Sequence, residues 1–246
     1  MSGRVTLKNA EPPAVVITCE HGGCQIPRPY RHLFRDAADT VKSHRGWDPG
    51  TLKLAKRFAV DLAAPLFSAT VTRLLVELNR SFGHPRLFSE FTESLDAESK
   101  TRLLADHWHP YRQEVEQAIA EKVAACGRVV HLSVHSFTPV WNEVQRKTDV
   151  GLLYDPARLP ERDFCQRWRT ALLSRGAEFT VHRNAPYRGT SDGFVTALRR
   201  QFADDEYIGI ELEVNQRFLL TSPQSHSKLP SLLTSSFRHA LMQPGA

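Results

Sequence analysis

The sequence contains no long apolar run, only four cysteines and no cluster of basic residues. No stretch approaches the ~18 consecutive apolar residues of a membrane span. Residues 1–13 are too polar for the apolar core of a secretory signal peptide. The cysteines, at positions 19, 24, 126 and 165, form no CxxC pair. These absences predict a cytoplasmic protein with reduced thiols and no membrane partner.

Basic residues exceed acidic ones only slightly, 32 against 27, which gives a net charge of +5. A nucleic-acid-binding protein more often gathers its basic residues in a stripe with interleaved aromatic side chains. Because no such stripe is present, we expect no nucleic-acid partner. The mild positive charge fits a small acidic substrate instead.

The 246 residues show no internal repeat and no low-complexity linker, and a single domain over residues 1–246 is predicted. Apolar runs predict strands at 14–19, 65–69, 73–78, 128–134, 178–182 and 207–214. Helical periodicity or helix-forming composition predicts helices at 51–64, 94–125 (one or two helices, kinked or divided at Pro110), 160–175, 191–202 and 227–242. This alternation predicts an α/β fold, with a mainly parallel mixed sheet covered by helices on both faces.

Polar residues follow the predicted strands where each strand ends. In chain order they are Glu20-His21, Asn79-Arg80, His135-Ser136, and Glu213 with Asn215 and Gln216. In sheets of this kind ligands bind outside the carboxyl ends of the strands. The sequence therefore predicts one functional site at that edge of the sheet.

His21 and Asp48 are candidate metal ligands. A lone histidine is more often a capping or core residue, but Gly22-Gly23 allow a close backbone approach that suits a ligand pocket, and metal ligation is favoured. Asp48 has two interpretations. It is either the N-cap of the helix that begins near Pro49, or the carboxylate of a catalytic zinc site with two imidazoles. Glu20 is either a second ligand or a residue that orients His21.

The strand at 128–134 and the last strand each present polar side chains on one face. His131, Ser133 and His135 share a face, and His135, at the strand exit, is the better metal ligand. Glu211 and Glu213 also share a face. A carboxylate in an apolar strand costs several kcal/mol unless it is paired, so a functional reason is expected. Glu213, nearer the strand end, is the better general base.

With these residues in view, the chain resembles the N-formylglutamate amidohydrolase family over residues 15 to about 220. The matching motifs are Cys-Glu-His-Gly-Gly at 19–23, His-Arg-Gly-Trp-Asp at 44–48, Leu-Asn-Arg at 78–80, His-Ser-Phe-Thr-Pro-Val at 135–140, Asn-Ala-Pro-Tyr-Arg-Gly at 184–189 and Leu-Glu-Val-Asn-Gln-Arg at 212–217. The family is distantly similar to zinc carboxypeptidases and aspartoacylases. The resemblance implies their phosphorylase/hydrolase-like, zinc exopeptidase-like fold.

The resemblance also implies residue roles. Zinc would be held by His21, His135 and a carboxylate. The relatives carry that carboxylate three residues after the first histidine, where this chain has Cys24, so Asp48 or Glu20 would replace it. The expected set comprises the metal ligands His21, Asp48 and His135, the catalytic base Glu213, and the substrate-binding residues Asn79, Arg80, Glu211 and Arg217.

The predicted function is a zinc-dependent amidohydrolase that cleaves the amide of a small N-acyl amino acid, N-formyl amino acids included. Zinc would polarise the acyl oxygen and activate water, and Arg80 would bind the free carboxylate of the substrate. Arg80 in a structural salt bridge is the competing interpretation of that residue. The competing function is a catalytically silent protein that binds an acidic metabolite in the same pocket.

Overall fold

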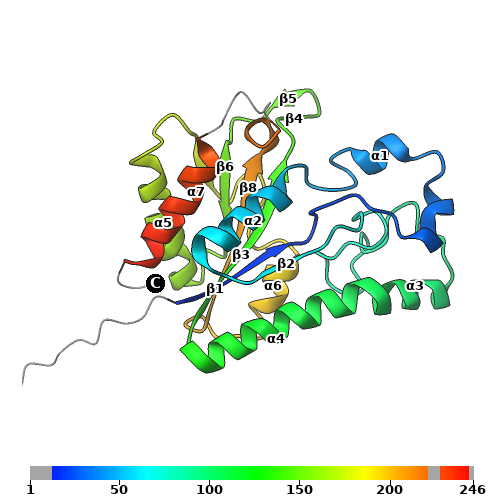
Figure 1. Ribbon diagram of the computed structural model, residues 1–246, viewed down its shortest axis with the longest axis horizontal. Helices are drawn as coiled ribbons and strands as arrows, with labels where there is room; N and C mark the ends of the chain where they lie inside the picture. Colours follow the sequence, from blue (N-terminus) through cyan, green and yellow to red (C-terminus); the bar gives the residue numbers. More distant parts are fainter. Residues whose placement is uncertain (1–12, 221–227, 244–246) are drawn as a thin grey trace, which may run out of the picture.

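A six-stranded mixed sheet with helices on both faces forms the centre of the computed structural model, which describes residues 13–220 and 228–243 (Figure 1). The strands, in sheet order, are β2 (Leu66–Ser68), β1 (Ala14–Cys19), β3 (Val129–Phe137), β8 (Tyr207–Asn215), β6 (Val150–Leu153) and β7 (Val181–Arg183). The first four are parallel, whereas β6 runs antiparallel to β8 and carries β7 parallel to itself. The predicted α/β class with a mainly parallel mixed sheet is confirmed.

Helices cover the two faces of the sheet unequally (Figure 1). On one face lie α2 (Thr51–Leu62), α5 (Leu159–Leu173) and α7 (Leu229–Leu241), and on the other lie α4 (His109–Cys126) and α6 (Phe194–Leu198). Shorter elements are η1 (Arg28–Phe34), α1 (Ala38–Lys42), α3 (Ala97–Leu103), the π-helical turn η2 (Leu104–Trp108), the hairpin strands β4 (Val140–Trp141) and β5 (Val144–Gln145), and η3 (Gln216–Phe218). Within the described part of the chain, no helix combines the length and apolar character needed to cross a membrane.

The central strand β3 is buried along its whole length, and its successive side chains point alternately to the two faces of the sheet. Val130, Leu132 and Val134 point into the large core under α2, α5 and α7. The other face packs at Val129 against α4 and α6, and farther along the same face come the polar residues that end in His135. The site is therefore confined to the α4–α6 face at the carboxyl end of the strands.

The predicted strand at 73–78 is wrong, because these residues form turns that pair with no strand of the sheet. Their apolar side chains are buried all the same. Leu74 and Leu75 enter one small hydrophobic cluster, and Val76 and Leu78 enter a second one beside α4. A turn that is buried on several sides needs apolar residues at consecutive positions, as a strand buried on both faces does, so the two cannot be distinguished by the apolar run alone.

Two other predicted elements differ in extent. The helix predicted at 191–202 is only α6, five residues long, because Gly193 before it is extended and turns follow it. The region 94–125 holds one continuous helical run from Ala97 to Cys126, in which α3, η2 and α4 follow one another. Its irregularity, the π-helical turn η2, lies just before Pro110, which stands in the first turn of α4.

Candidate metal centre and active site

His21, Asp48 and His135 converge on one point. One possible ligand atom from each lies within 4.8 Å of the others, and all three residues are buried. A single carboxylate oxygen, Asp48 Oδ2, lies 3.2 Å from His21 Nδ1 and 3.0 Å from His135 Nδ1. The three residues come from the turn after β1, the loop before α2 and the end of β3. The fold thus brings together the three ligands that the sequence predicted.

The outer nitrogen of each imidazole meets a second carboxylate. His21 Nε2 lies 2.5 Å from Glu77 Oε1. His135 Nε2 lies 3.3 Å from Glu20 Oε2 and 2.8 Å from Ser133 Oγ. Metal-ligating histidines characteristically have this arrangement, in which one nitrogen faces the ion and the other is held by a carboxylate that orients the ring.

The geometry also separates the two interpretations of Asp48. Gly50 occupies the N-cap position of α2 and makes no side-chain cap, and Asp48 contributes only its main-chain carbonyl, which accepts a bond from Thr51 N at 3.2 Å. Its carboxylate is turned to the two histidines. Glu20 instead supports His135, and its other oxygen accepts a bond from Tyr111 at 3.3 Å. Asp48 is therefore the residue placed to be the carboxylate ligand.

A half-buried arginine, Arg73, links two of these carboxylates. Its Nη1 donates to Asp48 Oδ1 at 3.1 Å and its Nη2 to Glu77 Oε2 at 2.6 Å. The role of this pair was missed, because residues 73 and 77 lie on a segment that was interpreted as a strand. The only available signal was a charged residue near each end of an otherwise apolar run.

Electrostatically, the cluster is suited to a divalent cation. Burial by itself would raise the pKa of Glu20, Asp48 and Glu77. Neighbouring histidines oppose this effect at all three carboxylates, and Arg73 does so at Asp48 and Glu77, so that each pKa lies well below its ordinary range. The same carboxylates, Asp48 and Glu20, raise the pKa of His135 well above its ordinary value against the effect of burial, so they draw positive charge to this point, where a bound dication would take the place of that proton. This donor set, with its charge, fits Zn²⁺.

Glu213 lies beside His135 on the neighbouring strand. The register pairs His135 with Glu213 and Ser133 with Glu211, so both carboxylates stand on the face of the metal ligands. Glu213 Oε2 is buried and, among the described residues, has no hydrogen-bond partner. Burial raises the pKa of Glu213 to about 8, with His135 opposing the effect and Asp48 and Glu211 adding to it. Burial also raises the pKa of Glu211.

Residues 13–220 match the sequence profile of a family described as N-formylglutamate amidohydrolase. The chain belongs to the N-formylglutamate amidohydrolase family. The predicted resemblance is thereby confirmed, and the family indicates a hydrolase that acts on amide bonds.

Two solved structures share the fold. A gene product of Agrobacterium tumefaciens superposes with a TM-score of 0.80 at 27% identity, over 95% of this chain and 93% of that one. The N-formylglutamate amidohydrolase of Ralstonia eutropha superposes with a TM-score of 0.68 at 17% identity, over 94% of each chain. No curated protein matches the sequence.

In this amidohydrolase the two residues predicted to bind the substrate, Asn79 and Arg80, make different contacts. Asn79 Oδ1 accepts a bond from Phe194 N at 2.7 Å and so fastens the start of α6. The Nη1 atom of Arg80 donates to the main-chain oxygens of Asn79 at 3.1 Å and Asp192 at 2.5 Å. Within the described ranges, no carboxylate lies within the 4.0 Å ion-pair distance of Arg80, and Glu77 is taken by Arg73. Arg80 therefore keeps its charge available for an anion.

Arg217, predicted to bind the substrate, and Cys24, at the position of the relatives' carboxylate ligand, lie apart from the cluster of His21, Asp48 and His135. Arg217 pairs with Asp149, and its side chain is 44% exposed, so a structural ion pair accounts for its position. Cys24 packs with the small hydrophobic cluster around Phe34, which agrees with its interpretation as a small apolar residue.

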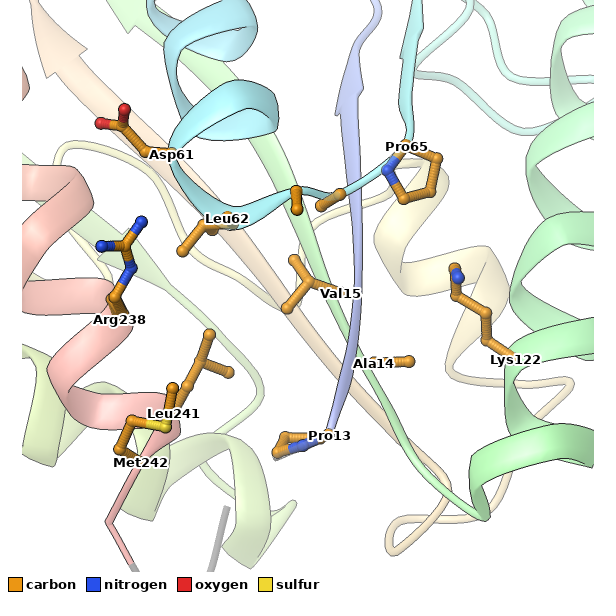
Figure 2. Close-up of a pocket in the computed structure, with 12 residues that line it drawn as sticks. Pro13, Ala14, Val15, Asp61, Leu62, Pro65, Lys122, Arg238, Leu241 and Met242 are labelled. Atoms are coloured by element: carbon orange, nitrogen blue, oxygen red, sulfur yellow. The ribbon is translucent and has the colours of Figure 1, made fainter. Parts of the chain in front are cut away.

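A separate hollow of about 350 Å³ lies at the opposite end of β1, near Pro13 and Ala14 (Figure 2). Its lining includes Lys122 from α4 and Arg238 from α7. Because the ligands of the metal cluster follow the carboxyl end of β1, this hollow and the candidate active site are at different ends of the sheet.

Proposed function

We propose that the chain is a zinc-dependent amidohydrolase that cleaves the amide bond of a small N-acyl amino acid with a free carboxylate. The observation that carries this proposal is the convergence of His21, Asp48 and His135 within 4.8 Å. Two imidazoles and a carboxylate form the usual protein ligand set of a catalytic zinc site with an open position. Glu77 and Glu20 orient the two imidazoles from behind.

A bound zinc ion would act as a Lewis acid on the acyl oxygen and lower the pKa of a water molecule at the site. The chain itself supplies the proton transfers. Glu213 stands beside His135 with one carboxylate oxygen unpaired. A nearby dication would favour the ionised form of Glu213, which could then take a proton from the attacking water and deliver it to the leaving amine nitrogen.

Arg80 supplies the orientation of the substrate. The Nη1 atom of its guanidinium is anchored to the main-chain oxygens of Asn79 and Asp192, and no carboxylate of residues 13–220 or 228–243 forms an ion pair with it. A substrate carboxylate bound there would hold the scissile amide in a fixed position relative to Glu213.

Metal content tests the proposal directly. The purified chain should hold about one zinc ion per molecule, lose amide hydrolysis on chelation and regain it when zinc is added back. His21→Ala and His135→Ala should each lose most of the zinc. His44→Ala is the matched control, because His44 precedes Asp48 in the same loop but contacts Trp141 instead of the donor cluster.

A screen of N-formyl, N-acetyl and N-succinyl amino acids would then identify the acyl group. A zinc-loaded chain that hydrolyses none of them, or a chain that hydrolyses them equally well without metal, would refute the proposed chemistry.

A further inference from the structure

The β4–β5 hairpin stands directly after β3, the strand that carries His135. Its two-residue turn, Asn142 and Glu143, has φ angles of 47° and 64°, the left-handed conformation of a tight hairpin. Around it, large apolar side chains remain exposed, with Trp141 at 50% and Val144 at 67%. A short hairpin thus follows the strand that carries His135, and Arg146 comes immediately after its second strand.

Arg146 is held in place by aromatic rings instead of by an acid. Its guanidinium carbon lies 5.3 Å from the ring centroids of Phe137, Trp141 and Tyr187. Its Nη1 donates to the Tyr187 hydroxyl at 3.1 Å, and its main-chain N–H donates to Pro139 at 2.8 Å. Within the described part of the chain, no carboxylate lies within 4.0 Å of this guanidinium.

The rings around Arg146 come from the segments that carry the catalytic cluster. Phe137 is two residues beyond His135 on the same strand, so both side chains point to the same face. Trp141 meets the ring of His44 edge-on at 6.0 Å, and His44 belongs to the loop that ends in Asp48.

The third ring, Tyr187, follows a backbone segment that lies close to Glu213. Gly151 is the register partner of Glu213, and a Cβ built on Gly151 would lie 2.2 Å from the Ala185 carbonyl and 3.2 Å from Glu213 Cβ. The segment that leads to Tyr187 therefore passes beside Glu213. The charge of Glu213 contributes, after burial, to the raised pKa of the Tyr187 hydroxyl, which agrees with this placement.

We propose that Arg146 determines substrate specificity by binding a second carboxylate of the substrate, on the side chain of its amino acid, while Arg80 binds the α-carboxylate. This inference rests on the proposed amidohydrolase function and deepens it. Neither guanidinium has an anionic partner among the residues that the structure describes, and each is held by hydrogen bonds to neighbouring groups. Arginine recognises carboxylates through two parallel hydrogen bonds, so a neutral substrate of equal size would lose that interaction.

The test compares N-formylglutamate with N-formylglutamine, which has the same shape without the second charge. Arg146→Gln should lower kcat/KM for the glutamate substrate by about ten- to a hundred-fold, and should change kcat/KM for the glutamine substrate by less than about threefold. Arg146→Lys should recover part of the loss, because the charge returns without the bidentate geometry. Arg45→Gln removes an exposed arginine from the loop before Asp48 and should leave the ratio unchanged.

An equal loss on both substrates would overturn the inference, because it would mean that Arg146 only supports the hairpin. An unchanged ratio would overturn it as well. If the wild-type chain hydrolyses neither substrate, their hydrolysis does not test Arg146, and the proposed function fails only if no N-acyl amino acid of the screen is cleaved either. The affinities of N-formylglutamate and N-formylglutamine for the zinc-loaded wild type and Arg146→Gln, measured by calorimetry, then test Arg146 alone. The same ratio of the two affinities in both proteins would refute its role.

Discussion

Replacing Glu213 by glutamine should change how the stability of the metal-free protein depends on pH. The folded state raises the pKa of Glu213 from 4.5 to about 8, with burial as the main cause. The folded protein therefore keeps a proton that the unfolded chain releases between these two values. The free energy of unfolding contributed by this carboxyl is highest below pH 4.5 and falls as the pH rises towards 8.

The size of the effect follows from the two pKa values. At about 1.4 kcal/mol for each pH unit, full ionisation of Glu213 in the fold would cost up to about 5 kcal/mol. Glu213→Gln has no proton to lose. Urea unfolding of the chelated wild type and variant, followed by tryptophan fluorescence between about pH 5 and about pH 9, should therefore show the wild type losing stability relative to the variant as the pH rises.

Glu121→Gln, on the exposed side of α4, is the control and should run parallel to the wild type. Zinc should reduce the pH dependence, because a nearby dication favours the ionised carboxylate. If the difference in unfolding free energy between wild type and Glu213→Gln stays constant over the whole pH range, Glu213 is already ionised in the metal-free fold. The argument for Glu213 as a proton carrier with a pKa near neutrality would then be refuted.

Three further predictions concern the residues around the site. Glu77→Gln and Glu20→Gln should each weaken zinc binding about 10- to 100-fold without abolishing it, as measured by competition with a chelator; unchanged affinity would contradict their orienting role. Arg80→Ala should lower kcat/KM about ten- to a hundred-fold for a substrate with a free α-carboxylate and leave kcat/KM for the α-amide analogue of that substrate unchanged. A lower melting temperature with intact kinetics would show instead that Arg80 is a structural residue. Trp108→Phe removes the indole N–H that donates to the Arg80 carbonyl at 3.0 Å and should raise KM for the acidic substrate. Trp168→Phe, which loses a similar bond to a serine in the core at 3.1 Å, should cost about 1 kcal/mol of stability and leave KM unchanged; equal KM values in the two variants would contradict the positioning role of Trp108.

The sequence alone determined which strands carry chemistry. The apolar runs at 14–19, 128–134 and 207–214 correspond to β1, β3 and β8, and the polar residues at their ends form the site. Strand alternation placed His135 and Glu213 on definite faces, and the carboxyl-end rule brought those faces to one edge. These inferences succeed because they depend on local periodicity and on a general property of parallel sheets.

The tertiary structure decided the contacts that no local pattern encodes. Asp48, not Glu20, faces both imidazoles. Glu20 lies on the face of Thr18, where it accepts a bond from Ser133 at 2.8 Å and approaches only His135 of the two histidines. Glu77 supports His21 from 56 positions away, on a turn whose buried leucines resemble a strand. Such pairings arise from the path of loops between elements, and that path is set by packing over the whole chain rather than by the residues at either end of the contact.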